Sequence, residues 1–241
     1  MQGAGCRVQR AACNDNIIVS SSNMSHRLLS HPSFDRARAT RTLAEADPQL
    51  GALIARVGPF ALETERLQSP FAALAESIVY QQLTGKAAAT IHGRVVALFR
   101  PRRSFGPEDI LSTPEGQLRG CGLSRAKTAA LKDLAVKTLE GVVPPIRDLR
   151  RLDDEAIIDR LVSVRGIGRW TVEMLLIFRL GRADVLPVTD YGVQKGFART
   201  FRRRLPTPKE LARRGERWKP FRSVAAWYLW RAVDGALPIA D

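Results

Sequence analysis

The sequence predicts an all-α fold, and three observations support this prediction. From Ala37 onward, apolar residues recur at three- and four-residue spacings, for example over residues 71–83 and 87–99. The strict alternation of apolar and polar residues that marks a half-buried strand is almost absent. Prolines and glycines, as in residues 144–145 and 166–168, interrupt the periodic segments. Together these features indicate many short helices joined by short loops.

The first part of the chain lacks this periodicity. Residues 1–36 mix Gln, Asn, Ser and Arg, and the run Ser20-Ser21-Ser22-Asn23 is typical of flexible chain. We expect a flexible tail over residues 1–36 and a helical domain over residues 37–241. Met24 precedes a basic stretch, so translation could begin at Met1 or at Met24.

The composition supplies a core and a strong positive charge. With 241 residues, 45% of them hydrophobic, the chain can bury a core without disulfide bonds. It carries 38 Lys and Arg against 24 Asp and Glu, a formal charge of +14. Such a charge suits a polyphosphate partner, but equally an acidic protein, a membrane surface or a solvated face. Charge alone therefore leaves the partner open.

Cysteine usage and hydropathy exclude several other classes of protein. Cys6, Cys13 and Cys121 are odd in number and form no CxxC pair, so neither a disulfide framework nor a zinc knuckle is predicted. No apolar run reaches the roughly 18 residues of a membrane span, and the N-terminal segment does not have the pattern of a secretory signal. We expect a cytoplasmic protein with no membrane partner, associated with the nucleoid if the source is bacterial.

A helix, a glycine turn and a second helix are predicted over residues 153–180. Three acidic residues open the first helix, over residues 153–164, at its positive end, and one face is apolar. The members of that face are Ile157, Ile158, Leu161 and Val162. Gly166 and Gly168 then allow a tight turn into the second helix, which contains Trp170. Glycines here let the backbone approach a phosphate, although an ordinary helix–helix turn would look the same.

The second helix is followed by a loop over residues 181–191 that ends in an aspartate. Asp190 stands at the expected N-cap of a helix opening at Tyr191. Capping alone would explain this carboxylate. The same position, at the positive end of a helix, would also hold a charged carboxylate outward for chemistry.

Four separated stretches resemble one protein family in both content and order. The strongest runs from Leu161 through the glycine turn to Met174 and on from Val185 to Tyr191. The others are residues 80–88, which include Gln81-Gln82-Leu83, residues 121–127 and residues 216–223. Together they are similar, over residues 65–235, to the helix-hairpin-helix (HhH-GPD) DNA glycosylases, most of all to the 3-methyladenine DNA glycosylase II type.

This resemblance implies a fold, an activity and a pocket. The family fold has two helical subdomains with the active-site cleft between them. The implied activity is that of a monofunctional glycosylase of base excision repair, which hydrolyses the N-glycosidic bond of alkylated purines and leaves an abasic site. Asp190 would be the catalytic carboxylate, and Tyr191, Trp230 and Trp170 would be rings of the substrate pocket. Trp170 could equally be core, as we expect for Trp218 and Trp227.

The resemblance also implies how double-stranded DNA is bound. Leu83 would be the wedge that fills the gap left by the rotated nucleotide, with Gln82 beside it; alternatively, Leu83 is a buried residue at a helix end. The hairpin would contact the DNA through Gly166, Ile167, Gly168, Arg169 and Thr171. Lys127 resembles a family residue that packs near the DNA, without a role in bond cleavage. One copy of the chain suffices for this function, so we expect a monomer.

Departures from related glycosylases narrow the chemistry. Strand-nicking relatives carry a lysine, which forms a Schiff base, two positions after the second hairpin glycine; here that position is Trp170. A C-terminal four-cysteine cluster is also missing, which argues against an iron–sulfur site. We expect no catalytic metal and no cofactor, apart from a structural Na+ or K+ that the backbone of Val162, Val164 and Ile167 could hold.

Two other functions stay open. One is a non-catalytic helix-hairpin-helix DNA-binding module, which would leave Asp190 unexplained. The other is a glycosylase for oxidised or mismatched bases, whose neutral leaving groups favour an additional acid. Glu76 and Glu173 are the nearby candidates, both expected on helix faces. A C-terminal basic cluster would hold phosphates or form a solvated surface; its members are Arg199, Arg202, Arg203, Arg204, Lys209, Arg213, Arg214 and Arg217.

Overall fold

The computed structural model describes residues 29–30, 34–65, 69–102 and 104–234, and it confirms a predominantly helical chain. Its elements are β1 (Leu29–Ser30), α1 (Arg36–Ala46), α2 (Pro48–Val57), β2 (Thr64–Glu65), α3 (Pro70–Tyr80), α4 (Gly85–Ala97), α5 (Pro107–Ser112), α6 (Glu115–Gly120), α7 (Arg125–Leu139), α8 (Ile146–Leu149), α9 (Asp154–Leu161), α10 (Arg169–Phe178), α11 (Tyr191–Thr200), α12 (Pro208–Gly215), η1 (Glu216–Trp218) and α13 (Arg222–Val233).

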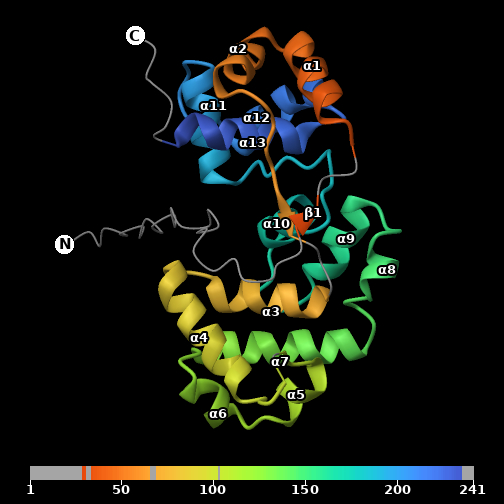
Figure 1. Ribbon diagram of the computed structural model, residues 1–241, viewed down its shortest axis with the longest axis vertical. Helices are drawn as coiled ribbons and strands as arrows, with labels where there is room; N and C mark the ends of the chain where they lie inside the picture. Colours follow the sequence, from red (N-terminus) through yellow and green to blue (C-terminus); the bar gives the residue numbers. More distant parts are fainter. Residues whose placement is uncertain (1–28, 31–33, 66–68, 103, 235–241) are drawn as a thin grey trace, which may run out of the picture.

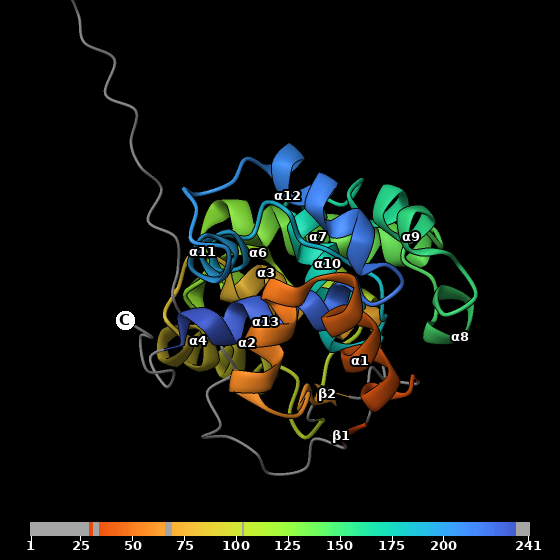
Figure 2. The ribbon, with the colours of Figure 1, turned by 90° about the horizontal axis from the view of Figure 1, so that it is seen from above.

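These elements form two helical subdomains, as the resemblance implies (Figure 1). The middle of the chain, α3 to α10, forms the lower subdomain. The upper one combines α1 and α2 with α11, α12 and α13, and from above it lies over the lower one (Figure 2). From α1 to α13 the described chain therefore crosses between the subdomains twice, once after α2 and once after α10.

The lower subdomain is built around α7. This helix begins at the N-cap Ser124, whose side chain accepts the N–H of Lys127, and it packs against α3 and α5. Leu131 and Leu134 on α7 are fully buried. Burial of such side chains is the main stabilising term of a helical layer, about 1.5–3 kcal/mol each. The result is a rigid platform beneath the α9–α10 pair.

The upper subdomain depends on a close approach of α11 to α13. Gly196 makes this approach feasible, since a Cβ there would overlap the backbone carbonyl of Leu229. Tyr228, on the same helix as Leu229, is fully buried and donates its hydroxyl to the carbonyl of Gly58 at 2.9 Å. Helix α13 is thereby fixed both to α11 and to the segment that leaves α2.

A buried ion pair joins α1 and α2 to the C-terminal helices. Asp47, between α1 and α2, is fully buried and accepts hydrogen bonds from Arg214 Nε at 2.8 Å and from Trp218 Nε1 at 3.0 Å. Burial alone would raise the pKa of Asp47, but these donors outweigh it and hold the pKa below its usual value. The contact connects segments about 170 residues apart in sequence.

The N-terminal prediction is modified where the structure describes it. Leu29 and Ser30 pair with Glu65 and Thr64 in a small antiparallel ladder, so this part of the expected flexible tail is ordered. Helix α1 begins at Arg36, one residue before the predicted boundary. The Ser20–Asn23 run and Met24 lie outside the described residues, as do Cys6 and Cys13.

Two general features of the described residues bear on function. None of their helices is long and apolar enough to cross a membrane. Cys121 is buried and forms no disulfide, and burial raises the pKa of its thiol, which makes the thiol unreactive.

Candidate active site

The predicted hairpin is present between α9 and α10. The side chain of Asp153 caps α9 by accepting the N–H of Ala156 at 2.8 Å, and Gly166 turns the chain with a left-handed φ of +79°. A side chain would be strained in that conformation. The apolar face of α9 is as predicted except at Val162, which follows the helix end and is 38% exposed.

Burial decides which hairpin atoms could meet DNA. Gly166 and Gly168 are exposed, as is Arg169. Ile167 and Thr171 retain only 4% and 8% exposure, because both side chains pack inward. The predicted contacts at these two positions are therefore limited to the backbone, which suits binding of a phosphate by N–H groups at a helix start.

Arg169 differs from the expected DNA contact because two carboxylates already hold it. Its NH1 donates to Glu155 at 2.9 Å and its Nε to Glu173 at 3.0 Å. The hydrogen bond that Arg169 donates to Glu155 is the main reason that the pKa of Arg169 is raised. The charge of this guanidinium is largely balanced inside the protein, so it offers less to a phosphate than a free arginine would.

The Gln-Gln-Leu turn is tied to the hairpin through α7. Lys127 Nζ donates to the carbonyl oxygens of Val79 and Gln81, both at 2.7 Å, and Gln81 Nε2 donates to the carbonyl of Gly166 at 2.8 Å. Burial lowers the pKa of Lys127. Beside this tether, Gln82 is exposed with a left-handed φ of +56° and Leu83 is half-buried. The sequence placed Lys127 near DNA but did not predict that it holds the backbone of Gln81, the residue whose side chain reaches the hairpin.

Asp190 is the N-cap of α11, as predicted, and its carboxylate is held by three N–H donors. Oδ1 accepts the backbone N–H of Val193 and Trp230 Nε1, each at 2.8 Å. Oδ2 accepts Trp170 Nε1, also at 2.8 Å. All three donors are neutral, and no lysine or arginine of the described chain forms an ion pair with Asp190. The carboxylate is thus fixed in direction while its negative charge stays uncompensated.

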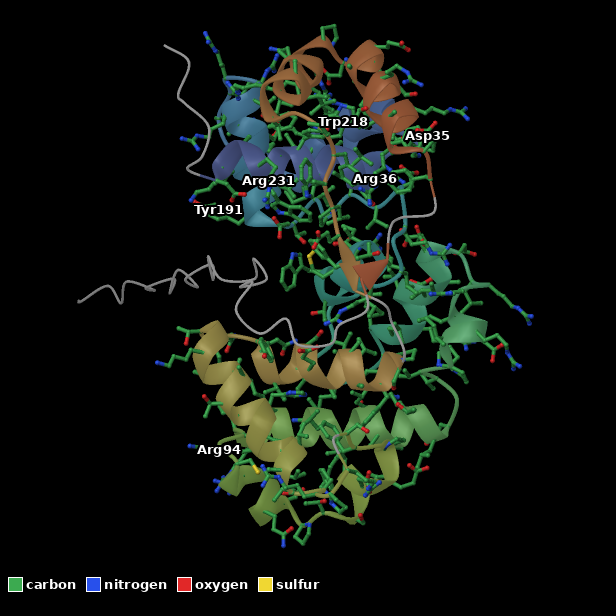
Figure 3. The ribbon with its side chains drawn as sticks, viewed as in Figure 1. Asp35, Arg36, Arg94, Tyr191, Trp218 and Arg231 are labelled. Carbon is green, nitrogen blue, oxygen red and sulfur yellow. The ribbon has the colours of Figure 1, made fainter. Side chains whose placement is uncertain are left out.

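Aromatic rings surround this carboxylate. Trp230 stacks on Phe178 with ring centroids 5.5 Å apart, and Trp170 is half-buried rather than part of the core. Tyr191 is 37% exposed at the lower edge of the upper subdomain (Figure 3), with Lys195 Nζ 4.7 Å from its ring centroid. Of the predicted pocket residues, Trp170 and Trp230 therefore contact Asp190 directly, whereas Tyr191 follows it in sequence and is exposed. Trp218 and Trp227 are buried core residues, as expected.

Gly192 allows the contact between Asp190 and Trp230. A Cβ at this position would lie 2.9 Å from Trp230 Cδ1 and 3.1 Å from Asp190 Oδ1. The first distance is too short for a carbon atom and the second is tight, so a larger residue would displace the indole and press on the carboxylate. The sequence contains the signal, a glycine two positions after the aspartate, but not the identity of its neighbour.

The loop that leads to Asp190 is anchored by the start of α13. Arg222 Nε donates to Asp184 Oδ1 at 2.8 Å, and Ser223 Oγ accepts the N–H of Val185 at 2.9 Å. Gly181 turns the loop at its start with a φ of +67°. The loop is therefore held at both ends, and the motif containing Arg222 and Ser223 acts as its support.

Glu76 and Glu173, the two candidates for an additional acid, have different environments. Glu76 pairs with Arg179 at 2.9 Å on a helix face. Glu173 is 2% exposed, and its Oε2 has no hydrogen-bond partner among the described residues. Burial is the main cause that raises the pKa of Glu173 to about 7; Arg169 opposes the shift, while the charge of Asp190 adds to it. A buried carboxyl with a raised pKa thus lies one helix turn from Arg169 and near the Asp190 site.

The arrangement can stabilise positive charge. It lies where α11 of the upper subdomain meets α10 of the lower one, since the Trp170–Asp190 bond joins these helices. An open cleft at this junction stays a prediction. The described residues contain no group of three or more His, Cys, Asp or Glu side chains that could hold a metal ion.

Comparisons with known proteins agree with this geometry. The family model for the HhH-GPD superfamily base excision DNA repair protein matches residues 75–220. A curated DNA-3-methyladenine glycosylase 1 of Schizosaccharomyces pombe is 38% identical over 68% of this chain and 72% of its own length.

Two solved structures are also similar. One is a 3-methyladenine DNA glycosylase of S. pombe in complex with abasic DNA, with a TM-score of 0.72 and 35% identity over 80% of this chain and 95% of that one. The other is a DNA-3-methyladenine glycosidase of Bacillus halodurans, with a TM-score of 0.75 and 31% identity over 86% of this chain and 93% of that one.

Proposed function

Because the chain belongs to the HhH-GPD superfamily of base excision DNA repair proteins, we propose that it is a monofunctional glycosylase removing alkylated purines, such as 3-methyladenine, from double-stranded DNA. One observation carries the proposal: the Asp190 carboxylate is aimed by three neutral N–H donors, two of which belong to the indole rings of Trp170 and Trp230. A structural cap would need only one of those donors.

DNA must first be opened at the lesion. A stacked base is out of reach, so its nucleotide rotates out of the duplex at a cost of a few kcal/mol. Leu83, half-buried on a turn that Lys127 and Gln81 hold in place, would fill the gap that the base leaves. The exposed glycines of the hairpin would fix the neighbouring phosphates through the backbone.

The bond is then broken with help from one carboxylate. A purine alkylated at N3 or N7 carries positive charge and leaves with the bonding electron pair, without prior protonation. Positive charge develops on the sugar, where Asp190 stabilises it. Water adds to C1′ and releases its proton, which Asp190 can accept. The indole rings favour the cationic base by cation–π attraction.

The residue at the lyase position supports hydrolysis without strand cleavage. By resemblance, glycosylases that also nick DNA have an amine there; this chain has Trp170, whose Nε1 is engaged with Asp190. A binding module without catalysis would not require this arrangement, so the structure offers no reason to prefer it.

We further propose a structural role for a monovalent cation, Na+ or K+, at the hairpin. Among the described residues no backbone N–H donates to the carbonyl oxygens of Val162 or Ile167, and Val164 accepts only the N–H of Ile167, at 3.0 Å. Oxygen donors of this kind fit such a cation. It would join the hairpin to a DNA phosphate and take no part in bond cleavage.

The test compares Asp190→Asn with Asp153→Asn on a duplex containing 1,N6-ethenoadenine or a 3-methyladenine analogue. Both aspartates cap a helix, and asparagine caps about as well, so Asp153→Asn should melt near the wild-type temperature. Asp190→Asn also loses the acceptor of one indole N–H, so it should stay folded but be less stable by about 1–3 kcal/mol. Abasic-site formation should fall by at least about 100-fold in Asp190→Asn and stay unchanged in Asp153→Asn. Wild-type protein that binds DNA but releases no base would overturn the proposal in favour of a binding module.

A further inference from the structure

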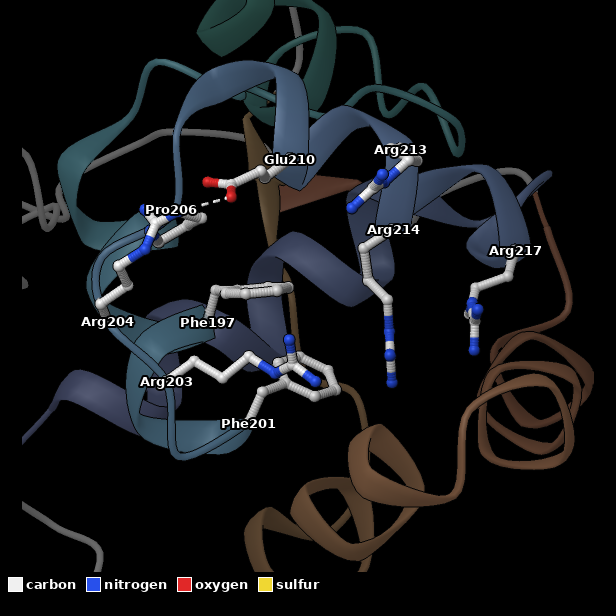
Figure 4. Close-up of a pocket in the computed structure, with 9 residues that line it drawn as sticks. All are labelled: Phe197, Phe201, Arg203, Arg204, Pro206, Glu210, Arg213, Arg214 and Arg217. Carbon is white, nitrogen blue, oxygen red and sulfur yellow. Dashed lines mark hydrogen bonds and ion pairs between the residues drawn. The ribbon is translucent and has the colours of Figure 1, made fainter.

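A basic cavity lies at the end of α11 remote from Asp190. It measures about 620 Å³ and is formed by the end of α11, the loop that follows it, α12 and η1 (Figure 4). Phe197, the residue of the cavity nearest to Asp190 along α11, lies seven residues beyond it, roughly 10 Å along the helix. It is therefore distinct from the site of base excision.

Five arginines and one glutamate line this cavity, together with two phenylalanine rings. Two of the arginines are held within the protein: Arg214 by the buried Asp47, and Arg204 by Glu210 at 2.7 Å. Glu210 also accepts the N–H of Thr207, and its pKa is lowered mainly by that bond. Its charge is thus already engaged and does not balance the remaining arginines.

The other three arginines have no partner among the described residues. Arg203, Arg213 and Arg217 are exposed and extend toward the same hollow from three different segments (Figure 4). Some exposed arginines elsewhere in the described chain pair with carboxylates, as Arg102 does with Asp109 and Arg147 with Asp148, but these three share one hollow without such a partner. Convergence of like charges without a counter-charge costs free energy, which an anion in the cavity would recover.

The backbone and the floor make the site rigid. Arg202 adopts a left-handed φ of +50°, a conformation that costs a non-glycine residue about 1 kcal/mol and directs the next two residues to the cavity. Arg214 lies over the ring of Phe201 at 4.5 Å, and Phe197 packs on Phe201 with centroids 4.6 Å apart. The cavity wall is therefore formed before any ligand arrives.

We propose that this cavity is a second anion site, which binds phosphate groups through Arg203, Arg213 and Arg217. Guanidinium groups match phosphate oxygens with paired N–H donors, and a hollow of this volume accommodates more than one phosphate. The phosphates belong either to the backbone of the DNA duplex beyond the lesion or to a free polyphosphate. The first of these sources rests on the proposed function; the second does not.

The experiment uses two triple variants of the full chain with the same net charge. The cavity variant carries Arg203→Gln, Arg213→Gln and Arg217→Gln. The control variant carries Arg119→Gln, Arg147→Gln and Arg151→Gln, at exposed positions on α6 and next to or on α8. All six side chains are exposed, so both variants should fold. Calorimetry with tripolyphosphate and DNA binding across a series of salt concentrations are the two measurements.

Tripolyphosphate should bind the wild type and the control variant and fail to bind the cavity variant, if the source is a free polyphosphate. If the source is the duplex, the cavity variant should lose at least about tenfold in DNA affinity near 0.1 M salt. Its plot of log affinity against log salt should also become shallower, by about 2–3 relative to the control. Equal tripolyphosphate affinities and equal salt slopes in the two variants would overturn the inference.

Base excision gives a separate readout. The cavity variant should release base at the wild-type rate once the duplex is saturated, because Asp190 and its donors are untouched. If the wild type releases no base, the proposed function fails, while tripolyphosphate binding still tests the cavity on its own.

Discussion

Asp47 and Asp190 are both held by tryptophan N–H groups, yet their surroundings give them opposite roles. Asp47 is fully buried, and Arg214 neutralises it with two hydrogen bonds. Asp190 is half-buried and receives neutral donors from Trp170, Trp230 and the backbone. The protein neutralises the charge of Asp47, whereas the charge of Asp190 is left for a ligand to neutralise.

This difference separates a structural carboxylate from a reactive one without reference to conservation. Hydrogen bonds alone do not decide the role, since both aspartates have several. The presence or absence of a cation does, because only an uncompensated charge can stabilise positive charge arising on a substrate. The same reasoning applies to positive charges in the basic cavity. Arg214 is neutralised by Asp47, whereas Arg203 has no counter-charge among the described residues.

The largest expected effect on stability is at Asp47. Asp47→Ala would leave Arg214 partly buried without its counter-charge, so the free energy of unfolding should fall by about 3–5 kcal/mol. Denaturant unfolding measures this loss, with Asp35→Ala, at an exposed N-cap, as the control. Protein that remains folded should still excise the lesion at the wild-type rate. A loss of excision in the folded fraction would contradict the division between the two aspartates.

The next effect concerns Glu173, a carboxylate with an incomplete set of partners. Its pKa is about 7 in the folded chain against 4.5 in an ordinary glutamate, so the folded state keeps a proton that the unfolded state gives up between these values. Stability should therefore fall as pH rises from about 4.5 to 7, by on the order of 3 kcal/mol, and level off above. Melting at several pH values checks this. Glu173→Gln should remove the fall, and the exposed Glu140→Gln should not.

A smaller loss is expected when Asp190 keeps its charge but loses a donor. Trp230→Phe and Trp170→Phe each remove one N–H from the carboxylate, and a hydrogen bond to a charged group contributes about 1.5–3 kcal/mol. Single-turnover excision should slow by about 10- to 100-fold in each variant. Trp227→Phe is the matched control, since its indole contacts Phe60 and Tyr228 but not Asp190. Equal rates in all three variants would show that orientation of Asp190 is unimportant.

The smallest predicted effect is on DNA binding. It extends the comparison to lysines whose ammonium groups are held by carbonyl oxygens of the protein. Lys127 and Lys132 both lie on α7 and both donate to backbone carbonyls, but only Lys127 reaches the Gln-Gln-Leu turn. Lys127→Met should weaken binding of an abasic duplex about fivefold, roughly 1 kcal/mol. Lys132→Met should lower the melting temperature comparably and leave DNA affinity unchanged. If the two variants bind DNA equally, the tether to the hairpin does not position the turn.

Local features of the fold and site were predictable from the sequence. The hairpin, the N-cap role of Asp190 and the helix opening at Tyr191 depend on residues within a few positions of one another, where capping and glycine turns have short-range signals. The error at Val162 arose because helix α9 ends at Leu161, three residues before the predicted end at residue 164. Apolar periodicity predicts which face of a helix is buried better than it predicts where the helix ends.

Contacts between distant segments were not predictable from local patterns; only the resemblance to the glycosylase family grouped Trp170 and Trp230 with Asp190. Trp170 lies 20 residues from Asp190, and Arg214 lies 167 residues from Asp47. Their meeting depends on how whole helices pack, which a single sequence does not encode in any local pattern. The burial of Glu173 was missed for the same reason, because an acidic residue on a helix is usually solvated.

The two crossings between the subdomains also govern the order in which the protein can be built during synthesis. Helices α1 and α2 leave the ribosome first, but their partners in the upper subdomain, α11 to α13, follow only after the whole of α3 to α10. A partly made chain can therefore assemble the half that carries the hairpin while Asp190 still lacks Trp230. Such an intermediate could bind DNA before it could excise a base. Synthesis of α13 is therefore the step that completes the active site.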